Sequence, residues 1–376
     1  MNVLYVCGSF PKIKCGVGDY TEMLYKSIKT NTDINAFVLT SNEATYEDSN
    51  VFCSMKKWTG PYLVKNILKH AKMVKADVIH FQFPASKYKF SSIFFLIFLP
   101  IILKMKRIKF IFTLHEYSDN RKMVKFALRT IIKKSNKIIV VDERFKKEIQ
   151  DKYNFDNNKI SYIQIGSNIA KSKLTVEEKK TLRDDFMKKM DCEKIIAYFG
   201  FINEAKCISE LMSALGQIKK EEKTKFCLLI IGDFNGEKCS KEYFNEIIKV
   251  VDEYSLKANI YSTGFVDEND VSTLLSISDF VVLPFKNGVS LRNGSMLASY
   301  QEGLKILTSF PKDKNIFFSQ KQFYFFDNTI DSMKRLISNQ MKQDFVRYDD
   351  GISVLWSDIA KEHYECYSNL LMSYKK

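Results

Sequence analysis

The sequence predicts an α/β protein with two doubly wound, Rossmann-like domains that face each other across a cleft, followed by a closing helix. Three observations indicate this fold. The length of 376 residues suits two domains of ordinary size. Strand-like and helix-like runs alternate along nearly the whole chain, and the alternation weakens near residues 166–173. We therefore expect domains over residues 1–168 and 169–351, and a closing helix over 352–376 that packs back toward the first domain.

The predicted strands are short runs rich in Val, Ile, Leu and aromatic residues. In the first domain they lie at residues 3–7, 36–40, 78–83, 109–114 and 137–141. In the second domain they lie at residues 195–199, 226–231, 260–263, 280–283 and 305–308. Helical runs separate them, for example at 20–28, 121–134, 208–218, 243–254, 271–276 and 296–301. Parallel sheets of this kind bind ligands at the carboxyl ends of their strands, so the cleft between the two domains is the expected site.

The net charge of +14 is confined to the first half of the chain. Residues 1–170 hold 28 Lys and Arg against 14 Asp and Glu, whereas residues 171–376 hold 30 of each class. The excess is densest between Lys56 and Lys147, where 22 basic residues accompany 5 acidic ones. A surface with a large excess of positive charge indicates a polyanionic partner, such as an acidic membrane, a phosphorylated acceptor or a nucleic acid. No helix-turn-helix, zinc-finger or RNP pattern occurs, so we expect no nucleic-acid partner.

The eight cysteines favour a reducing compartment. No two have CxxC spacing, and several lie in apolar strand-like runs, such as Cys7 and Cys227. Buried free thiols are the expected state. The apolar run at residues 3–7 has no basic segment before it, which disfavours a signal peptide and favours a cytoplasmic location. No HExxH motif or carboxylate cluster predicts a metal site.

Two segments of the first domain carry candidate site residues. The first strand is followed by a loop with Gly16 and Gly18, whose backbone can approach a phosphate at the start of the next helix. An ordinary tight turn is the alternative for this loop. His115 and Glu116 come directly after a strand, and His80 lies near the end of the strand before it. A strand-end histidine can exchange hydrogen bonds with a substrate near neutral pH, or it can be structural.

The second domain has its own candidates at the same end of its sheet. Lys206 follows the domain's first strand and stands where a helix begins, a place where the helix dipole disfavours a cation. Binding of a diphosphate would explain a lysine at this position. The alternative is that Lys206 is a solvated surface residue. Further along, Gly294 and Ser295 can open a helix toward an anion, and Arg292 can bind that anion with two parallel hydrogen bonds.

These segments, in this order and spacing, resemble glycosyltransferase family 4, a family of retaining enzymes with the GT-B fold. In the first half the resemblance rests on GSFPKIKCGVGDYTEML, DVIHFQFP and TLHEY. In the second half it rests on YFGFINEAKCISELMSAL, IIGDFN, GFVDENDVSTLLSISDFVVLPF and GVSLRNGSMLASYQEGL. It covers nearly the whole chain, including the closing segment VLWSDIAKEHYECYSNLL. The GVSLRxGS-type loop is similar to that of a divergent branch.

The resemblance implies a role for each candidate. The glycine loop after the first strand would line the donor phosphates. His115 would lie at the donor sugar, and Lys206 would bind the diphosphate. Phe265 and Val266 would border the base pocket through their backbone groups. The first domain would hold the acceptor, and the second domain would hold the donor.

The sequence also departs from the family pattern. Phe201 stands in place of the usual arginine, and Asn287 and Ser295 stand roughly in place of the usual pair of glutamates. Arg292 would restore the lost positive charge. We therefore expect an active, divergent enzyme. A catalytically silent binding subunit that keeps the fold is one alternative, and a nucleotide-sugar epimerase of the same fold is another.

The implied function is transfer of a sugar from a nucleotide-sugar donor to a glycan or lipid-linked acceptor, in surface polysaccharide or glycoconjugate synthesis. The enzyme would be a retaining, hexosyltransferase-type enzyme, with the acceptor hydroxyl attacking on the side of the leaving group. The nucleotide sugar would be a co-substrate, so no cofactor is expected. Lys206, Arg292 and helix N-termini would neutralise the phosphates, so no metal would be needed.

Residues 90–103 form an apolar run, FSSIFFLIFLPIIL, followed by the basic segment KMKRIK. This run is shorter than the ~20 residues a spanning helix needs, and Pro100 interrupts it. A buried core helix is one expectation. The other is a peripheral anchor on the inner face of a membrane, an anionic surface that would be a partner of the protein. The cations expected to meet the lipid are Lys104, Lys106, Arg107 and Lys109.

Overall fold

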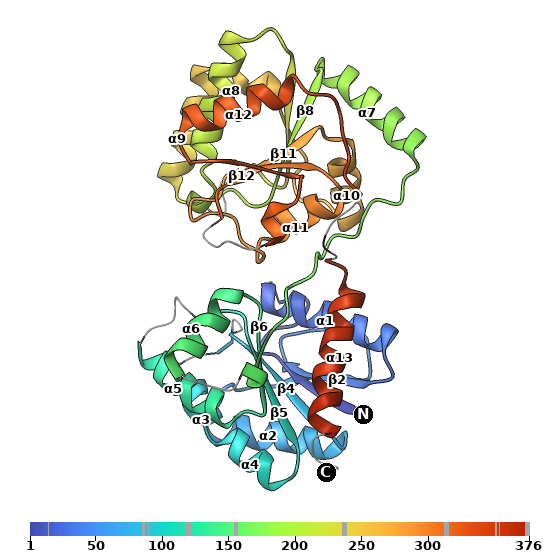
Figure 1. Ribbon diagram of the computed structural model, residues 1–376, viewed down its shortest axis with the longest axis vertical. Helices are drawn as coiled ribbons and strands as arrows, with labels where there is room; N and C mark the ends of the chain where they lie inside the picture. The colour runs from blue at the N-terminus through green and yellow to red at the C-terminus, as the bar shows by residue number, and fades with distance from the viewer. Residues whose placement is uncertain are drawn as a thin grey trace. The chain divides into compact units, whose positions relative to one another are not determined.

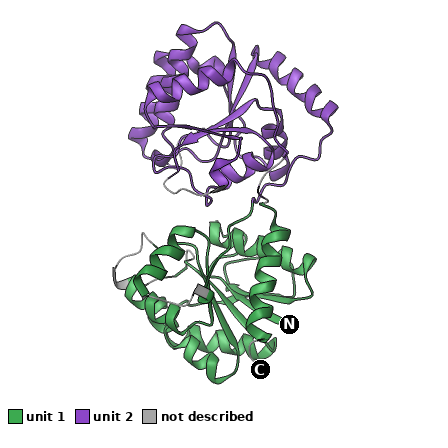
Figure 2. Ribbon diagram, viewed as in Figure 1, with its two compact units in different colours: residues 1–166, 354–376 green, residues 167–353 purple. Residues whose placement is uncertain are grey.

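In the computed structural model, the chain folds into two compact α/β units (Figure 1). The structure describes residues 1–13, 15–84, 87–88, 90–117, 122–153, 157–234, 239–311, 316–349, 352 and 354–372. Unit 1 comprises Met1–Gly166 and Val354–Lys376, and unit 2 comprises Ser167–Ser353 (Figure 2). The divisions expected from the sequence, after residues 168 and 351, lie within two residues of these.

Unit 1 contains a seven-stranded parallel sheet with the strand order β3-β2-β1-β4-β5-β6-β7. Its strands are β1 (Asn2–Val6), β2 (Asn35–Ser41), β3 (Val51–Met55), β4 (Val78–Phe83), β5 (Lys109–Leu114), β6 (Lys137–Val140) and β7 (Ile160–Tyr162). Its helices are α1 (Gly16–Asn31), α2 (Gly60–Met73), α3 (Phe90–Leu96), α4 (Leu99–Met105), α5 (Lys122–Lys134), α6 (Glu143–Tyr153) and α13 (Trp356–Met372). The central strands β4 and β5 are buried along their whole length, as expected for a parallel sheet covered on both faces.

The unit 1 sheet has a core on each face, because successive side chains of a strand point in opposite directions. On one face, Phe81 and Phe112 of the central strands stack with ring centres 5.7 Å apart and pack among residues of α2 to α6. On the other face, Tyr5 and Ile111 pack among residues of α1 and α13. Side chains at alternate positions of β4 and β5 therefore lie in different environments.

The last helix, α13, belongs to unit 1 although the whole of unit 2 precedes it in the sequence (Figure 2). Its residues Trp356, Ile359 and Tyr367 are buried in the core that α1 also enters. Gly166 leaves no room for a side chain, because a Cβ there would lie 2.8 Å from Trp356 and 2.9 Å from Ile359. The small residue at the end of the first stretch thus lets α13 pack closely.

Unit 2 contains a six-stranded parallel sheet, apart from one isolated antiparallel bridge, with the order β10-β9-β8-β11-β12-β13. Its strands are β8 (Lys194–Phe199), β9 (Phe226–Ile231), β10 (Ile260–Ser262), β11 (Phe280–Leu283), β12 (Lys305–Ser309) and β13 (Phe323–Phe326). Its helices are α7 (Val176–Met190), α8 (Ile208–Glu221), α9 (Lys241–Glu253), α10 (Glu268–Ile277), α11 (Gly294–Gln301) and α12 (Ile330–Met341). Helices α8, α9 and α12 pack together, as do α7 and α10, so unit 2 is also doubly wound (Figure 1).

The apolar run at residues 90–103 forms two short helices, α3 and α4, rather than one. Pro100 lies in the first turn of α4, where its missing N–H has no helical acceptor to lose. Leu96 and Leu103 are fully buried, whereas Phe94 is 54% exposed. The run is therefore amphipathic, a combination of the two alternatives that the sequence left open. No helix in the described part of the chain is long and apolar enough to cross a membrane.

Candidate active site

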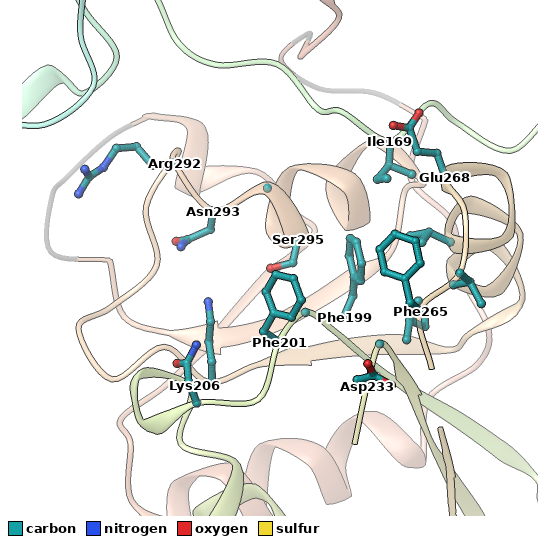
Figure 3. Close-up of a pocket in the computed structure, with 17 residues that line it drawn as sticks. Ile169, Phe199, Phe201, Lys206, Asp233, Phe265, Glu268, Arg292, Asn293 and Ser295 are labelled. Atoms are coloured by element: carbon teal, nitrogen blue, oxygen red, sulfur yellow. The ribbon is translucent and has the colours of Figure 1, made fainter. Parts of the chain in front are cut away.

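A pocket of unit 2 lies at the carboxyl ends of β8 and β9 (Figure 3). It has a volume of about 620 Å³, within the range of small-molecule sites. Its walls come from the loop after β8, the segment after β10 and the start of α11. This is the edge at which parallel α/β sheets bind their ligands.

Glycines end the strands that border this pocket. Gly200 follows β8 with φ at +136°, and Gly232 follows β9 with φ at +137°, a region that favours glycine. A Cβ on Gly232 would lie 3.0 Å from the carbonyl oxygen of Gly200. The two strand ends therefore approach closely, and backbone forms the floor of the pocket between them.

Lys206 places a partly buried ammonium group in the pocket. It ends a short turn that begins with Asn203, whose side-chain oxygen accepts a hydrogen bond from the N–H of Ala205 at 3.1 Å. Its Nζ lies 4.2 Å from the centre of the Phe285 ring. Among the described residues, no carboxylate pairs with this cation. Burial lowers the pKa of Lys206 from 10.5 to about 8, because it disfavours the charged form of the amine.

The start of α11 reaches the same pocket. The pocket is lined by Arg292, Gly294 and Ser295, the residues predicted from the sequence to form an anion site. Figure 3 shows Lys206 and Ser295 directed into the pocket, whereas the guanidinium of Arg292 is directed away from both. The structure therefore brings Lys206 and the N-terminus of α11 together and turns the Arg292 head group outward.

Two strongly exposed rings line the pocket: Phe201 is 55% exposed and Phe265 is 86% exposed. Flat aromatic surfaces of this kind stack on planar bases. Val266 lines the pocket as well. The carboxylates of Asp233 and Glu268 also reach it, and sequence reasoning did not single them out. No motif marks these two residues; they become recognisable once the ends of β9 and the start of α10 are assembled.

His115 of unit 1 directly follows β5 and is half-buried. Its backbone N–H donates to the carbonyl of Phe83 at 2.7 Å, and its ring packs edge-on against Tyr20 of α1 with ring centres 4.6 Å apart. The ring nitrogen Nε2 lies 2.8 Å from Oε1 of Gln82. Glu116, the next residue, is also half-buried. These contacts hold the imidazole at the carboxyl edge of the unit 1 sheet.

Gly16 and Gly18 lie in the first turn of α1 rather than in a loop before it, and one of the two has a packing role. A Cβ on Gly18 would lie 3.0 Å from the carbonyl oxygen of Ser9, so the close contact between loop and helix requires glycine there. At Gly16 a Cβ would meet nothing within 4 Å. The expected contact of this loop with a donor phosphate stays a prediction.

His80, expected as a second candidate on the acceptor side, is completely buried in β4. Its Nδ1 lies 2.7 Å from the hydroxyl of Tyr367, and its Nε2 lies 2.5 Å from the hydroxyl of Thr113. Both ring nitrogens are used inside the core, so His80 touches no acceptor and that expectation is wrong. Burial holds the pKa of His80 well below its usual value, which keeps the ring neutral.

Comparisons with protein families divide along the chain as the structure does. The family described as Glycosyltransferase Family 4 matches residues 42–171, and the one described as Glycosyl transferases group 1 matches residues 180–289. Together these matches cover more than half of the sequence. Among curated proteins, no relative matches the chain.

Solved structures share the fold over its full length. A glycosyltransferase from Rickettsia africae superposes with a TM-score of 0.70 at 16% identity, over 98% of each chain. HepE from Anabaena, in complex with UDP and glucose, superposes with a TM-score of 0.64 at 13% identity, over 100% of each chain. The UDP-GlcNAc 2-epimerase from Methanocaldococcus jannaschii has a TM-score of 0.58 at 10% identity, over 97% of this chain and 100% of that chain.

The fold is therefore GT-B, with two parallel sheets in two doubly wound units. Since both halves match glycosyltransferase family models, the chain is a glycosyltransferase of the family 4 type.

Proposed function

We propose that this glycosyltransferase moves a sugar from a nucleotide-sugar donor to a glycan or lipid-linked acceptor, in the synthesis of a surface polysaccharide or glycoconjugate. Unit 2 would bind the donor, and unit 1 would bind the acceptor. The strongest support is the ammonium of Lys206, which lies in the unit 2 pocket without a carboxylate partner among the described residues. Burial disfavours the charged form of Lys206, and a bound anion would offset that penalty.

Each part of a nucleotide sugar has a chemical counterpart in the pocket. A diphosphate would lie against Lys206 and the N-terminus of α11, where the helix dipole favours negative charge. A base would stack on Phe265 and bind backbone groups at Val266. Asp233 or Glu268 would accept hydrogen bonds from ribose hydroxyls. Because HepE binds UDP and UDP-glucose, uridine nucleotides are the first to test.

We further propose that transfer retains the anomeric configuration and needs no metal. His115 and Glu116 would serve at the donor sugar, and the loop of Gly16 and Gly18 would approach the phosphates. The acceptor hydroxyl would attack on the side of the departing diphosphate, through an oxocarbenium-like transition state. Lys206 would stabilise the charge that develops on the leaving group.

Phe201 favours one competing function, a silent binding subunit, because it lines the pocket where the family usually has an arginine. An epimerase is the other, since enzymes of that class share the fold. Sugar transfer to an added acceptor, with release of the nucleotide, separates the three functions. A silent subunit would release no nucleotide, and an epimerase would change the sugar while it stays on the nucleotide.

A thermal-shift panel with UDP, GDP, ADP, CMP and their sugars tests the donor site. We expect one nucleoside diphosphate and its sugar to raise the melting temperature. A ligand at 100 times its Kd increases the free energy of unfolding by about 2.7 kcal/mol. Arg292→Ala should weaken binding of this nucleotide by about 1–3 kcal/mol if the guanidinium turns inward on binding. Arg335→Ala, which removes an exposed arginine of α12, is the control. Absence of any shift across the panel would contradict a donor site in unit 2.

We also propose that α3, α4 and α5 bind an anionic membrane surface. Exposed apolar side chains gather on these contacting helices and the link between them: Phe94, Phe98, Ile101, Met105 and Phe126. Exposed cations, Lys104, Lys106 and Arg107, lie at the end of α4. Apolar groups flanked by cations suit the headgroup region of an acidic bilayer. Lys109 is removed from the expected set, because it is buried in β5.

The charge distribution supports this surface. Unit 1 holds 31 Lys and Arg against 17 Asp and Glu, whereas unit 2 holds 27 of each class. All of the excess positive charge thus lies in the unit that carries the exposed apolar helices. A lipid-linked acceptor would then be met where unit 1 touches the membrane.

Co-sedimentation with liposomes tests the membrane proposal. Binding is expected to require acidic lipid and to fall with salt, because each cation near the surface contributes about 1 kcal/mol and exposed charges are screened. Replacing Lys104, Lys106 and Arg107 with Gln should weaken binding at least about tenfold. The matched control replaces three exposed lysines of α7 in unit 2, Lys180, Lys188 and Lys189. Equal binding to neutral and acidic vesicles at low salt would contradict the proposal.

A further inference from the structure

A line of buried polar side chains runs across one face of the unit 1 sheet and ends at His115. The members on β4 are His80 and Gln82, and those near the end of β5 and directly after it are Thr113 and His115. Each pair is two residues apart, so all four point to the face covered by α1 and α13. Gln82 and Thr113 are partners in the strand register, and both are fully buried, as is His80.

The orientation of the Gln82 amide indicates the protonation of His80. The amide nitrogen can only donate, and it lies 3.4 Å from Nε2 of His80. With the amide oriented in this way, Nε2 is the unprotonated nitrogen, and it can also accept from the hydroxyl of Thr113. The proton of the neutral ring is then on Nδ1, which donates to the hydroxyl of Tyr367 at 2.7 Å.

The same amide fixes the protonation of His115. With its nitrogen turned to His80, Gln82 presents Oε1 to Nε2 of His115 at 2.8 Å. A carbonyl oxygen only accepts, so Nε2 of His115 carries a proton. Tyr20 adds a second restraint, because its ring lies edge-on against His115 while its hydroxyl lies 3.2 Å from Nε2 of His363.

We propose that Gln82, oriented by His80, is a positioning residue that holds His115 as its Nε2–H tautomer. The proposal rests on the proposed function only in giving that tautomer a purpose at the donor sugar. In this tautomer Nδ1 keeps the lone pair, so a ligand group that meets Nδ1 must be a hydrogen-bond donor, such as a sugar hydroxyl, and not a carboxylate. We call the hydrogen bonds that link His80, Gln82 and His115 the positioning chain. Such a chain explains why His80 is buried with hydrogen-bond partners at both ring nitrogens.

The other histidines differ in a way that makes the tautomer measurable. The chain has four histidines. In His70 and His363, Nδ1 lies 2.8 Å from a backbone carbonyl, of Asn66 and Ile359 respectively, and therefore carries the proton. His80 is also expected to be protonated at Nδ1, which faces the hydroxyl of Tyr367. His115 is thus expected to be the one histidine protonated at Nε2.

Long-range ¹H–¹⁵N correlation spectra of protein labelled with ¹⁵N-histidine test the proposal without any substrate. Near pH 8 we expect three Nδ1–H patterns and one Nε2–H pattern, and the latter should disappear in His115→Ala. Gln82→Met removes both hydrogen-bonding atoms at similar volume and should change the His115 pattern. Gln82→Glu, which when protonated can donate to His80 and accept from His115, should restore it.

Ser54→Ala is the matched control, because it removes the hydroxyl 3.1 Å from Nε2 of His70 and leaves the Gln82 chain intact. An Nδ1–H pattern for His115 in the wild type would overturn the proposal. So would a His115 pattern that Gln82→Met leaves unchanged, with the His70 signals confirming that this variant is folded. In the transfer assay, Gln82→Met should lower kcat by about tenfold or more with little change in the donor KM. If His115→Ala keeps full activity while the tautomers are as stated, the proposed role of His115 fails and the positioning chain stands.

Discussion

Replacing His115 with alanine is expected to lower the rate of sugar transfer by roughly 100-fold or more, the loss typical of a preorganised hydrogen-bonding group at a reaction centre. The imidazole lies at the carboxyl edge of the unit 1 sheet, held by Gln82 and Tyr20. Nucleotide affinity should stay near the wild-type value, since the Lys206 pocket is built by unit 2 alone. Initial rates of transfer and calorimetric titration of the nucleotide measure the two quantities.

A second variant separates catalysis from folding. His115→Ala removes the donor to the buried Oε1 of Gln82 and should cost about 1 kcal/mol of stability. His115→Gln can keep a side-chain N–H directed at Gln82, so its melting temperature should remain closer to that of the wild type. Both variants should be inactive if the ring serves the sugar. Normal turnover in His115→Gln would show that only the hydrogen bond to Gln82 matters.

Lys206→Met is expected to have opposite effects on binding and on stability. Loss of the charge-assisted contact should weaken the binding of a nucleoside diphosphate by about 1–3 kcal/mol. The free protein should become more stable by about 1–3 kcal/mol below pH 8, because the variant no longer holds an ammonium group in a partly buried site. Lys286→Met, at an exposed neighbouring lysine, is the control and should change neither quantity appreciably. Calorimetry and chemical denaturation give the two free energies.

The pH dependence of these effects follows from the lowered pKa of Lys206, about 8 in the folded protein against 10.5 ordinarily. The unfolded chain binds more protons between these values, so the penalty on wild-type stability is complete below pH 8 and disappears as pH rises toward 10.5. The stability gain of Lys206→Met should shrink over the same window. Nucleotide affinity of the wild type should fall by about tenfold from pH 7 to pH 9, as the cation is lost, and that of the variant should not. A flat wild-type profile would contradict a role for this ammonium.

The alternation of strands and helices was predictable because both faces of each sheet are buried, which makes a strand such as β9 continuously apolar. The strands β3, β7 and β13 were missed. They lie at sheet edges and carry shorter or less buried runs, so their pattern is weaker. Helix α7 was missed because none of its residues is buried. It is marked instead by a capping box between Thr175 and Glu178, a signal that hydrophobic periodicity does not contain.

The candidate site was predictable where it depends on one strand end. Lys206 and the start of α11 could be found because each follows a strand and reaches the carboxyl edge of the sheet. Asp233 and Glu268 could not, because their meeting depends on how separate loops are brought together. For Gln82 and Thr113 a signal did exist: polar residues at every second position of buried strands must be hydrogen-bonded inside the core. Both residues contact His80, whose own partner on α13, Tyr367, lies far along the chain and is known only from the fold.

A crystal structure with the nucleotide that gives the largest thermal shift tests the proposed donor site. The nucleotide is expected to occupy the unit 2 pocket, with a diphosphate oxygen within hydrogen-bond distance of Lys206 Nζ and the base against Phe265. Its phosphates should also contact the first backbone N–H groups of α11. A nucleotide bound elsewhere, or bound in this pocket with its phosphates directed away from Lys206, would contradict a donor site built on Lys206.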